Sequence, residues 1–273
     1  MAERSAQARR AGATVGFVPT MGALHEGHLD LIRRAREGCG QVMCSIFVNP
    51  LQFNDPRDLE RYPRQLEKDS ALLTDAGCTV LFSPSREELF DSFTPSTYAL
   101  GGLDEYWEGP SRPGHFQGVV NVVERLFFYV RPDKAFFGEK DRQQLAIIRH
   151  IGRTHRWPED IVPCPTVRTS EGLALSSRNQ RLSPEERAQA TVLNRALRRA
   201  AELAFTGTVQ EVQAAAMVVL DTEPSVVLDH FGIADVDTLA PLDSWGDRKQ
   251  AVALVAAQVG PVRLIDNITL MRP

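Results

Sequence analysis

Short apolar runs alternate with amphipathic stretches over the first two thirds of the chain. Five runs are mainly apolar and have the length of buried strands: residues 14–18, 41–48, 79–82, 134–137 and 160–165. Four stretches carry apolar side chains at helical spacing: residues 27–38, 59–76, 117–130 and 143–155. Strands and helices in alternation predict an α/β fold, with a parallel sheet that has helices on both faces.

Two other stretches have weaker patterns. Residues 1–11 are expected to form the end of a charged helix. Residues 83–114 are interrupted by prolines and glycines, so we expect mainly loop and short elements there, with residues 98–100 as a candidate edge strand.

The character of the chain changes after residue 179. Ser183 is followed by Pro184 and then by Glu186, a pattern that predicts a capped helix start. Two helices, reaching to about residue 204 and covering 209–220, come before three strands near residues 226–231, 251–258 and 262–268, which we expect to pair antiparallel. We therefore expect a first domain over residues 1–175 and a smaller α+β domain over residues 176–273.

Composition narrows the functional class. The chain has 273 residues, of which 43% are hydrophobic and 24% charged, and its net charge of −4 argues against non-specific nucleic-acid binding. No stretch approaches the ~18 apolar residues of a membrane span, and the charged N-terminus does not read as a signal peptide. The four cysteines lack metal-binding spacing and are expected to be reduced, so we expect a cytoplasmic protein that does not bind membranes.

The candidate chemistry starts directly after the first strand. Gly22 and Gly27 allow a close backbone approach to a ligand, and His25 and His28 share one face of the following helix. Free N–H groups at that helix start would favour an anion. Two imidazoles and a helix N-terminus together suit a polyphosphate, whereas the alternative is a pair of solvated or internally bonded histidines.

Four loops follow strands of the predicted sheet and should converge at its carboxyl edge: residues 19–28, 49–53, 138–144 and 167–179. They carry imidazole, amide, ammonium, guanidinium, carboxylate and hydroxyl groups: His25, His28, Asn49, Gln52, Lys140, Asp141, Gln144, Ser176, Ser177 and Arg178. Lysine and arginine are usual partners of a transferring phosphoryl group. The chain has no P-loop, no G-x-G-x-x-G and no nucleophile elbow around its serines.

A more specific resemblance lies in six blocks of sequence: Pro19 to His28, Ser45 to Phe53, Tyr62-Pro63-Arg64, Ser111 to Phe116, Phe136 to Asp141 and Leu175 to Asn179. In this order the blocks closely resemble the pantoate–β-alanine ligase family, also called pantothenate synthetases, over essentially the whole chain.

The resemblance implies a nucleotidyltransferase-type, Rossmann-like domain, a smaller C-terminal lid domain and a homodimer in the cytoplasm. It implies small-molecule substrates: pantoate and ATP, with Mg²⁺, form pantoyl adenylate and pyrophosphate, and β-alanine then displaces AMP to give pantothenate. A second domain that closes over the nucleotide would keep water from the hydrolysable adenylate.

Roles carry over by position in the motifs. Residues implied to bind ATP are Met21, Gly22, Ala23, Leu24, His25, Glu26, Gly27, His28, Gly138, Glu139, Lys140, Asp141, Val167, Leu175, Ser176, Ser177 and Arg178. Those implied to act in catalysis are His28, as proton donor, with His25, Lys140 and Arg178. Those implied to bind pantoate or to border the amine site are Gln52, Gln144, Asn49, Arg112 and His115.

The chemistry agrees with these roles, because the carboxylate of pantoate is itself the nucleophile and amides can orient it without neutralising its charge. Two departures stand out. Arg142 occupies a usually aromatic position, and Lys68 lies between Glu67 and Asp69 where the family tends to be acidic, which leaves the protein ligand of Mg²⁺ open. The rival hypotheses are a plain adenylyl- or cytidylyltransferase, which needs no amine site, and a nucleotide-binding protein that has lost catalysis.

Overall fold

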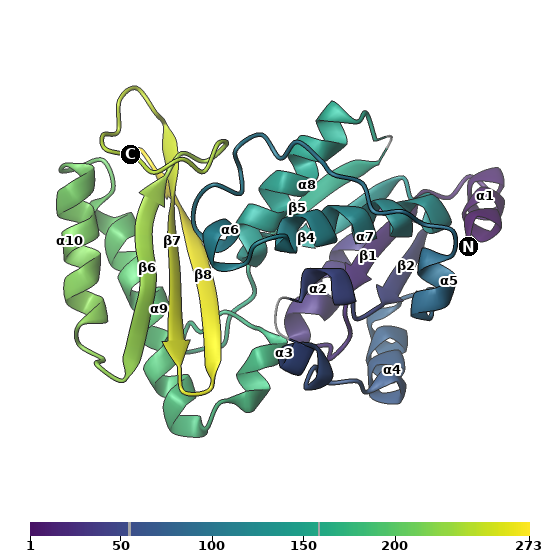
Figure 1. The fold of residues 1–273 in the computed structure, drawn as a ribbon, viewed down its shortest axis with the longest axis horizontal. Coiled ribbons are helices and arrows are strands. Elements are labelled where there is room, and N and C mark those ends of the chain that lie inside the picture. The colour runs from purple at the N-terminus through teal and green to yellow at the C-terminus, as the bar shows by residue number, and fades with distance from the viewer. Residues whose placement is uncertain (54–55, 158) are drawn as a thin grey trace. The chain divides into compact units, whose positions relative to one another are not determined.

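Five parallel strands form one sheet in the order β3-β2-β1-β4-β5, as the alternation of strand and helix predicts (Figure 1). The strands are β1 (Val15–Thr20), β2 (Gln41–Ile46), β3 (Val80–Phe82), β4 (Lys134–Gly138) and β5 (Asp160–Cys164). The computed structural model describes residues 1–53, 56–157 and 159–273. These residues form two compact units, one of Met1–Glu139 with Gln144–Pro165 and one of Lys140–Gln143 with Thr166–Pro273.

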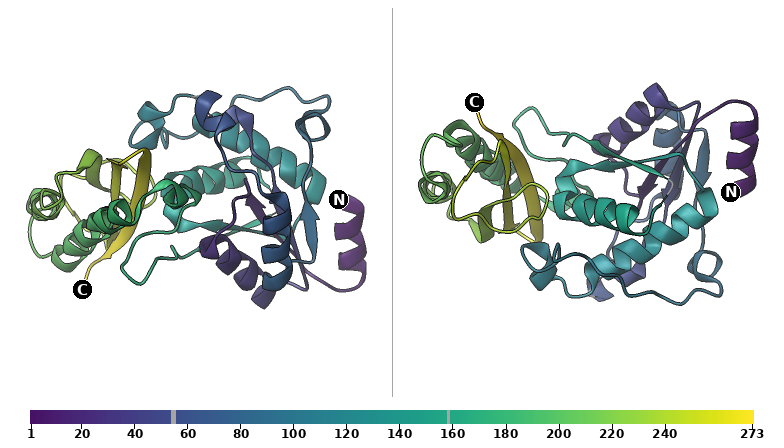
Figure 2. Two further views of the ribbon diagram at one scale, coloured as in Figure 1. Left: turned by 90° about the horizontal axis from the view of Figure 1, so that it is seen from below. Right: turned by 90° about the horizontal axis from the view of Figure 1, so that it is seen from above.

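Helices cover both faces of the five-stranded sheet (Figure 2). The helices of this part of the chain are α1 (Ala2–Arg10), α2 (Glu26–Gly38), α3 (Pro56–Glu60), α4 (Leu66–Ala76), α5 (Arg86–Phe90), α6 (Glu108–Ser111), α7 (His115–Val130) and α8 (Arg142–Thr154), with 3-10 turns η1 (Pro50–Gln52) and η2 (Glu139–Asp141). In β1, Val18 packs in one core cluster with Ile32 of α2, whereas Phe17 contacts Phe127 of α7 at a ring-centroid distance of 6.2 Å. Because successive strand residues face opposite sides, α2 and α7 lie on opposite faces.

The sheet opens at the carboxyl end of β1. All six residues of β1 pair with β2, but only Gly16 and Phe17 pair with β4. Strand order also reverses at β1, since β2 and β3 lie on one side and β4 and β5 on the other. Pro19 has no N–H to donate to a ladder. Such a reversal is the place where open α/β sheets bind ligands.

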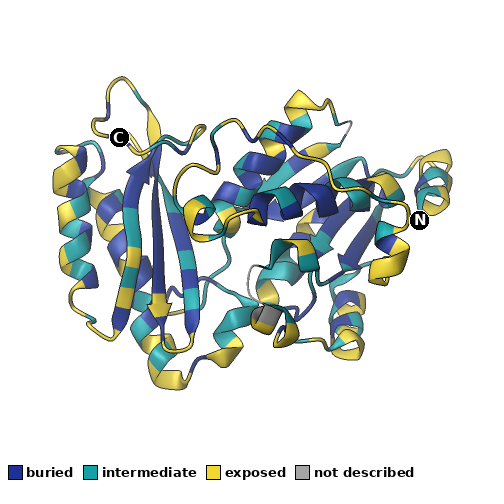
Figure 3. Ribbon diagram, viewed as in Figure 1, coloured by how far each residue is buried: buried dark blue, intermediate teal, exposed yellow. Residues whose placement is uncertain are grey.

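The second unit has its own core. Three antiparallel strands, in the order β6-β7-β8, pack against two helices: β6 (Val226–Ala234), β7 (Gln250–Val259), β8 (Val262–Met271), α9 (Pro184–Leu203) and α10 (Val209–Leu220), with the 3-10 turn η3 (Ser177–Arg181). Nearly all of β7 is buried, which Figure 3 shows as an almost continuous dark strand. The capped start at Ser183 is confirmed, because its hydroxyl accepts from the amide of Glu186 at 3.1 Å while Glu186 accepts from the amide of Ser183 at 2.7 Å.

Two expectations from the sequence are wrong. The helix expected over 59–76 is interrupted, because residues 61–65 separate α3 from α4 and include Pro63, which cannot continue a helix that precedes it. Residues 98–100 form no strand. The backbone N–H and carbonyl of Tyr98 bond instead to the side-chain amide of Gln117, at 3.0 and 2.9 Å, so a side chain takes the place of a neighbouring strand.

The four cysteines are free thiols. Burial is the largest of the effects that raise the pKa of each thiol, and the pKa of Cys44 is raised most strongly. Among the helices that the structure describes, none combines the length and the apolar character needed to cross a membrane.

Candidate active site

Two successive residues in the loop between β1 and α2 have positive φ angles, in the left-handed region. Gly22 has φ +81° and Ala23 has φ +50°. A Cβ at Gly22 would lie 3.0 Å from an oxygen of Asp69, so the glycine serves a tight turn against that carboxylate. The Asp69 oxygens accept from the amides of Ala23 and Leu24, each at 2.9 Å. Asp69, which the sequence pattern does not single out for this role, is therefore part of the site's architecture.

The two histidines cap the helix that they begin. His25 is the N-cap of α2, and its Nδ1 accepts from the amide of Gly27 at 3.2 Å. Nδ1 of His28 accepts from the amide of His25 at 3.4 Å, and the two rings lie 4.0 Å apart, tilted by 31°. Because Nδ1 accepts in both rings, the proton of each neutral imidazole belongs on Nε2.

This geometry corrects one expectation from the sequence. The amides of His25 and Gly27 are not free donors for an anion, because imidazole nitrogens of the same motif occupy them. The motif offers imidazole Nε2–H donors in place of those two backbone N–H groups.

The loop after β2 presents Gln52 on a 3-10 turn. Asn49 caps that turn and donates through Nδ2 to Gln52 Oε1 at 3.1 Å and to the carbonyl of Gly118 at 3.1 Å. Gln52 Nε2 lies 2.9 Å from the sulfur of Met21, and Nδ1 of His115 lies 2.9 Å from the main-chain oxygen of Gln52. Asn49 is 1% exposed and His115 is 5% exposed, so both side chains fix the position of Gln52 from below the surface.

Gly118 allows this arrangement. A Cβ at Gly118 would lie 2.1 Å from the main-chain oxygen of Leu51, closer than any real contact. Helix α7 can therefore approach η1 only with glycine at this position.

The first unit thus brings the loops after β1 and β2, and the two ends of the loop after β4, to one edge of its sheet. They follow β1, β2 and β4, which are neighbours in the sheet. Gly138 ends β4, and Gln144 lies half-buried in the first turn of α8. Arg112 ends α6, with its amide bonded to the carbonyl of Gly109 at 3.1 Å and its carbonyl accepting from His115 at 3.0 Å.

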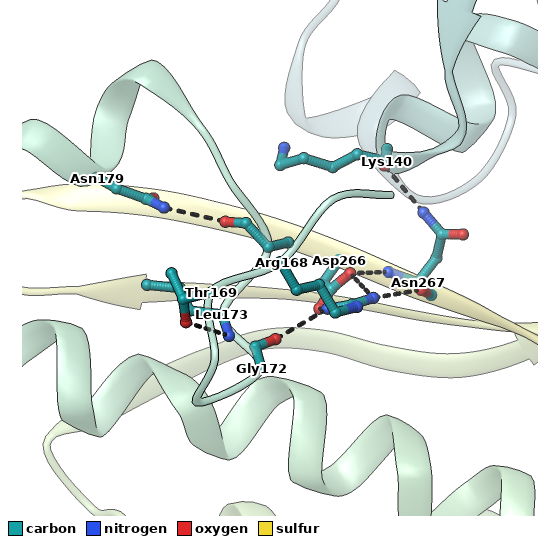
Figure 4. A network of polar contacts seen from close by, with 9 residues as sticks. Lys140, Arg168, Thr169, Gly172, Leu173, Asn179, Asp266 and Asn267 are labelled. Atoms are coloured by element: carbon teal, nitrogen blue, oxygen red, sulfur yellow. Dashed lines mark hydrogen bonds and ion pairs between the residues drawn. The ribbon is translucent and has the colours of Figure 1, made fainter. Parts of the chain in front are cut away.

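The second unit holds Lys140 and the Val167–Arg178 segment together (Figure 4). Arg168 forms a two-point ion pair with Asp266, at 2.5 and 2.8 Å, and also donates to the carbonyl of Gly172. The next residue of β8, Asn267, donates through Nδ2 to the main-chain oxygen of Lys140 at 2.9 Å. Adjacent residues of β8 therefore anchor both Lys140 and the Val167–Arg178 segment, a hairpin in which Arg168 and Ala174 form an antiparallel bridge.

The hairpin continues into the serine pair. The amide of Leu175 bonds to the carbonyl of Val167 at 3.0 Å, and the hydroxyl of Ser176 accepts from the amide of Arg178 at 3.3 Å. Ser176, Ser177 and Arg178 are half-buried. Lys140, Ala174 and Asp266 line a cavity of about 10 Å³, the size of one water molecule, so the lysine lies against the hairpin.

The two departures from the family pattern have different surroundings. Lys68 is exposed, and the guanidinium of Arg142 lies 3.5 Å from the carbonyl of Val236. Within the described part of the chain, no three histidine, cysteine, aspartate or glutamate side chains gather in a way that could hold a metal ion.

Known proteins match this architecture over nearly its full length. Residues 1–269 match the family described as Pantoate-beta-alanine ligase. The pantothenate synthetase of Rubrobacter xylanophilus is 50% identical over 98% of this chain and 95% of its own length. The crystal structure of pantothenate synthetase from Thermus thermophilus is 48% identical, covers 96% of each chain and has a TM-score of 0.90.

A third relative was solved with ligands. The pantoate–β-alanine ligase of Francisella tularensis, complexed with β,γ-ATP and β-alanine, is 33% identical over 94% of this chain and 90% of its own, with a TM-score of 0.76. Together with the match over residues 1–269 and the fold itself, these similarities show that the chain belongs to the pantoate–β-alanine ligase family.

Proposed function

We propose that the chain's ligase activity proceeds through an acyl adenylate. A carboxylate oxygen of pantoate attacks the α-phosphorus of ATP, and the bond from that phosphorus to the leaving pyrophosphate breaks. The neutral amine of β-alanine then attacks the carbonyl carbon of pantoyl adenylate, loses one proton and expels AMP. Membership of the ligase family supports this sequence of steps, in which no protein nucleophile is needed.

The observation that carries the assignment is the histidine pair at the start of α2. With Nδ1 engaged by backbone amides, His28 and His25 direct Nε2–H donors to a phosphate oxygen of bound ATP. Lys140 and Arg178 balance the negative charge that grows on the leaving pyrophosphate. The other residues that we assign to ATP are Met21 to Gly27, Gly138, Glu139, Asp141, Val167, Leu175, Ser176 and Ser177.

Gln52 and Gln144 orient pantoate. Their neutral amides bond to its carboxylate and hydroxyl groups without reducing the charge of the nucleophile. Asn49 and His115 contribute by fixing Gln52. We assign Arg112 to the carboxylate of β-alanine, because a guanidinium pairs well with a carboxylate that does not react.

Mg²⁺ enters as the ATP complex in this proposal. Its usual ligands are substrate phosphates, water and one or two carboxylates, and the described residues offer no cluster that would bind the ion alone. We further propose a cytoplasmic homodimer in which residues 176–273 act as a lid that excludes water from the adenylate.

Isotope exchange between labelled pyrophosphate and ATP tests the proposal. We expect exchange to require pantoate and Mg²⁺ and to proceed without β-alanine, because adenylate formation is reversible and does not involve the amine. Exchange that does not depend on pantoate would contradict the ligase mechanism and would favour a plain nucleotidyltransferase.

A further inference from the structure

Asp69 has a buried carboxylate that accepts hydrogen bonds from the backbone of the loop between β1 and α2. Its side chain projects from α4 and is 1% exposed. One oxygen accepts from the amide of Ala23 and the other from the amide of Leu24, each at 2.9 Å. Two successive amides are therefore fixed on a single carboxylate.

The clamped segment has a conformation that does not persist by itself. Ala23 has φ +50° and is fully buried, although residues with a Cβ adopt this region rarely. Such a residue keeps its conformation only where the surroundings impose it. The carboxylate of Asp69 supplies that constraint, while the hydroxyl of Thr20 holds the neighbouring amide of Gly22 at 3.2 Å.

The clamp lies immediately before the histidine pair. Leu24 is followed by His25, the N-cap of α2, and the orientation of both imidazoles depends on where that cap begins. A shift of the Ala23–Leu24 peptide would therefore move both Nε2–H donors.

We propose that Asp69 is a positioning residue for adenylation, which holds Ala23 and Leu24 so that His25 and His28 meet the phosphates of ATP. The role of the loop rests on the proposed function, whereas the clamp itself rests on the hydrogen bonds. A different role for the same carboxylate is a direct ligand of Mg²⁺, and the two roles predict different results.

Three variants separate the roles. Asp69→Asn keeps the shape of the side chain, but its single carbonyl oxygen can accept from only one of the two amides, so its NH₂ group faces the other. Ala23→Gly makes the left-handed conformation easy and lowers the need for the clamp. Glu67→Gln removes a charge from an exposed position two residues away on the same helix and serves as the matched control.

Residue-resolved hydrogen exchange tests the clamp without any measurement of activity. We expect Asp69→Asn to speed the exchange of the Ala23 and Leu24 amides, whereas Glu67→Gln leaves both unchanged. Unchanged protection of these amides in Asp69→Asn would overturn the clamp, whatever the enzyme does.

Pyrophosphate exchange then tests the link to adenylation. We expect Asp69→Asn to raise KM for ATP by roughly 10- to 100-fold, the scale of one broken buried hydrogen bond, with the same Mg²⁺ dependence as the parent. Asp69→Asn/Ala23→Gly should recover several-fold of that loss. A defect that excess Mg²⁺ cures and Ala23→Gly leaves unchanged would overturn positioning in favour of metal ligation. A parent enzyme without pantoate-dependent exchange would contradict the proposed function, and the amide protection would still decide the clamp.

Discussion

Asn267 donates a hydrogen bond of 2.9 Å from its side-chain Nδ2 to the main-chain oxygen of Lys140. The last strand of the chain thereby fixes the turn that carries Lys140, the lysine that we assign to the phosphates of ATP. The neighbouring residue Asp266 is 4% exposed at its side chain and pairs with Arg168. The small antiparallel sheet consequently anchors both Lys140 and Arg168 within the second unit.

Asn267→Asp should weaken this anchor. The substitution places a carboxylate oxygen, which accepts, where an N–H donor meets a carbonyl. We expect KM for ATP in pyrophosphate exchange to rise by about tenfold, the scale of one buried hydrogen bond. Met271→Ala, at a 60% exposed position near the end of the same strand, is the control and should behave like the parent. An unchanged KM for ATP in Asn267→Asp would show that Lys140 does not need the anchor.

His28→Ala should lower the rate of adenylation by about 10²- to 10⁴-fold, the range for a general acid or an electrostatic donor. The fold should survive, because the lost cap bond is long, at 3.4 Å, and contributes at most about 1 kcal/mol. Single-turnover formation of the adenylate measures the rate, and urea unfolding measures stability. Near-normal turnover, or an unfolded variant, would favour a purely structural pair of histidines.

The lowered pKa of Asp235 should make the free energy of unfolding depend on pH. Burial raises the pKa of this carboxyl, but the guanidinium of Arg248 at 2.8 Å and the amides of Thr238 and Asp237 outweigh burial and lower the pKa to about 2. A folded pKa below the unfolded value of about 3.9 stabilises the protein above pH 4, and the contribution is lost as the pH falls toward 2. Because the Arg248 side chain is 40% exposed, we discount the contribution to about 1 kcal/mol.

Asp235→Asn should therefore lower the free energy of unfolding by about 1 kcal/mol at pH 7 and by much less near pH 2. Urea titrations of both proteins at the two pH values provide the comparison. If the free energies of unfolding of the two proteins differ by the same amount at both pH values, the effect comes from packing and not from the charge of Asp235.

The two half-reactions should depend on different cationic side chains. Arg112→Ala should leave pantoate-dependent exchange largely intact and slow the formation of pantothenate, because we assign Arg112 to β-alanine. Lys140→Ala should depress both steps, since little adenylate forms without charge balance on the phosphates. Single-turnover measurement of adenylate and pantothenate in each variant separates the steps. Equal loss of both steps in Arg112→Ala would show that its loop supports the whole pocket.

Local patterns predict the elements around the site well. The strand, loop and helix over residues 14–38 follow from apolar spacing and two glycines, and the start of α9 follows from the capping pattern at Ser183. Pro63 is also visible in the sequence, but the apolar spacing on both sides of it favours one long helix. These are short-range signals, because each depends on residues within a few positions of one another.

The supports of the site are long-range, and the sequence does not predict them. Asp69 lies 46 positions from Ala23, and Asn267 lies 127 positions from Lys140. An aspartate in the first turns of a helix is normally explained by the helix dipole, and an asparagine in a strand by exposure. Only the packing of α4 and β8 shows that each side chain bonds to the backbone of another segment.

The fate of the carboxylate oxygens of pantoate tests the central claim most directly. With pantoate labelled by ¹⁸O in its carboxylate, attack on the α-phosphorus followed by amine attack on the carbonyl carbon leaves one labelled oxygen in AMP. We predict one ¹⁸O atom in each AMP and none in pyrophosphate, read by mass spectrometry. Unlabelled AMP, with the label found instead in inorganic phosphate or in pyrophosphate, would contradict the adenylate mechanism.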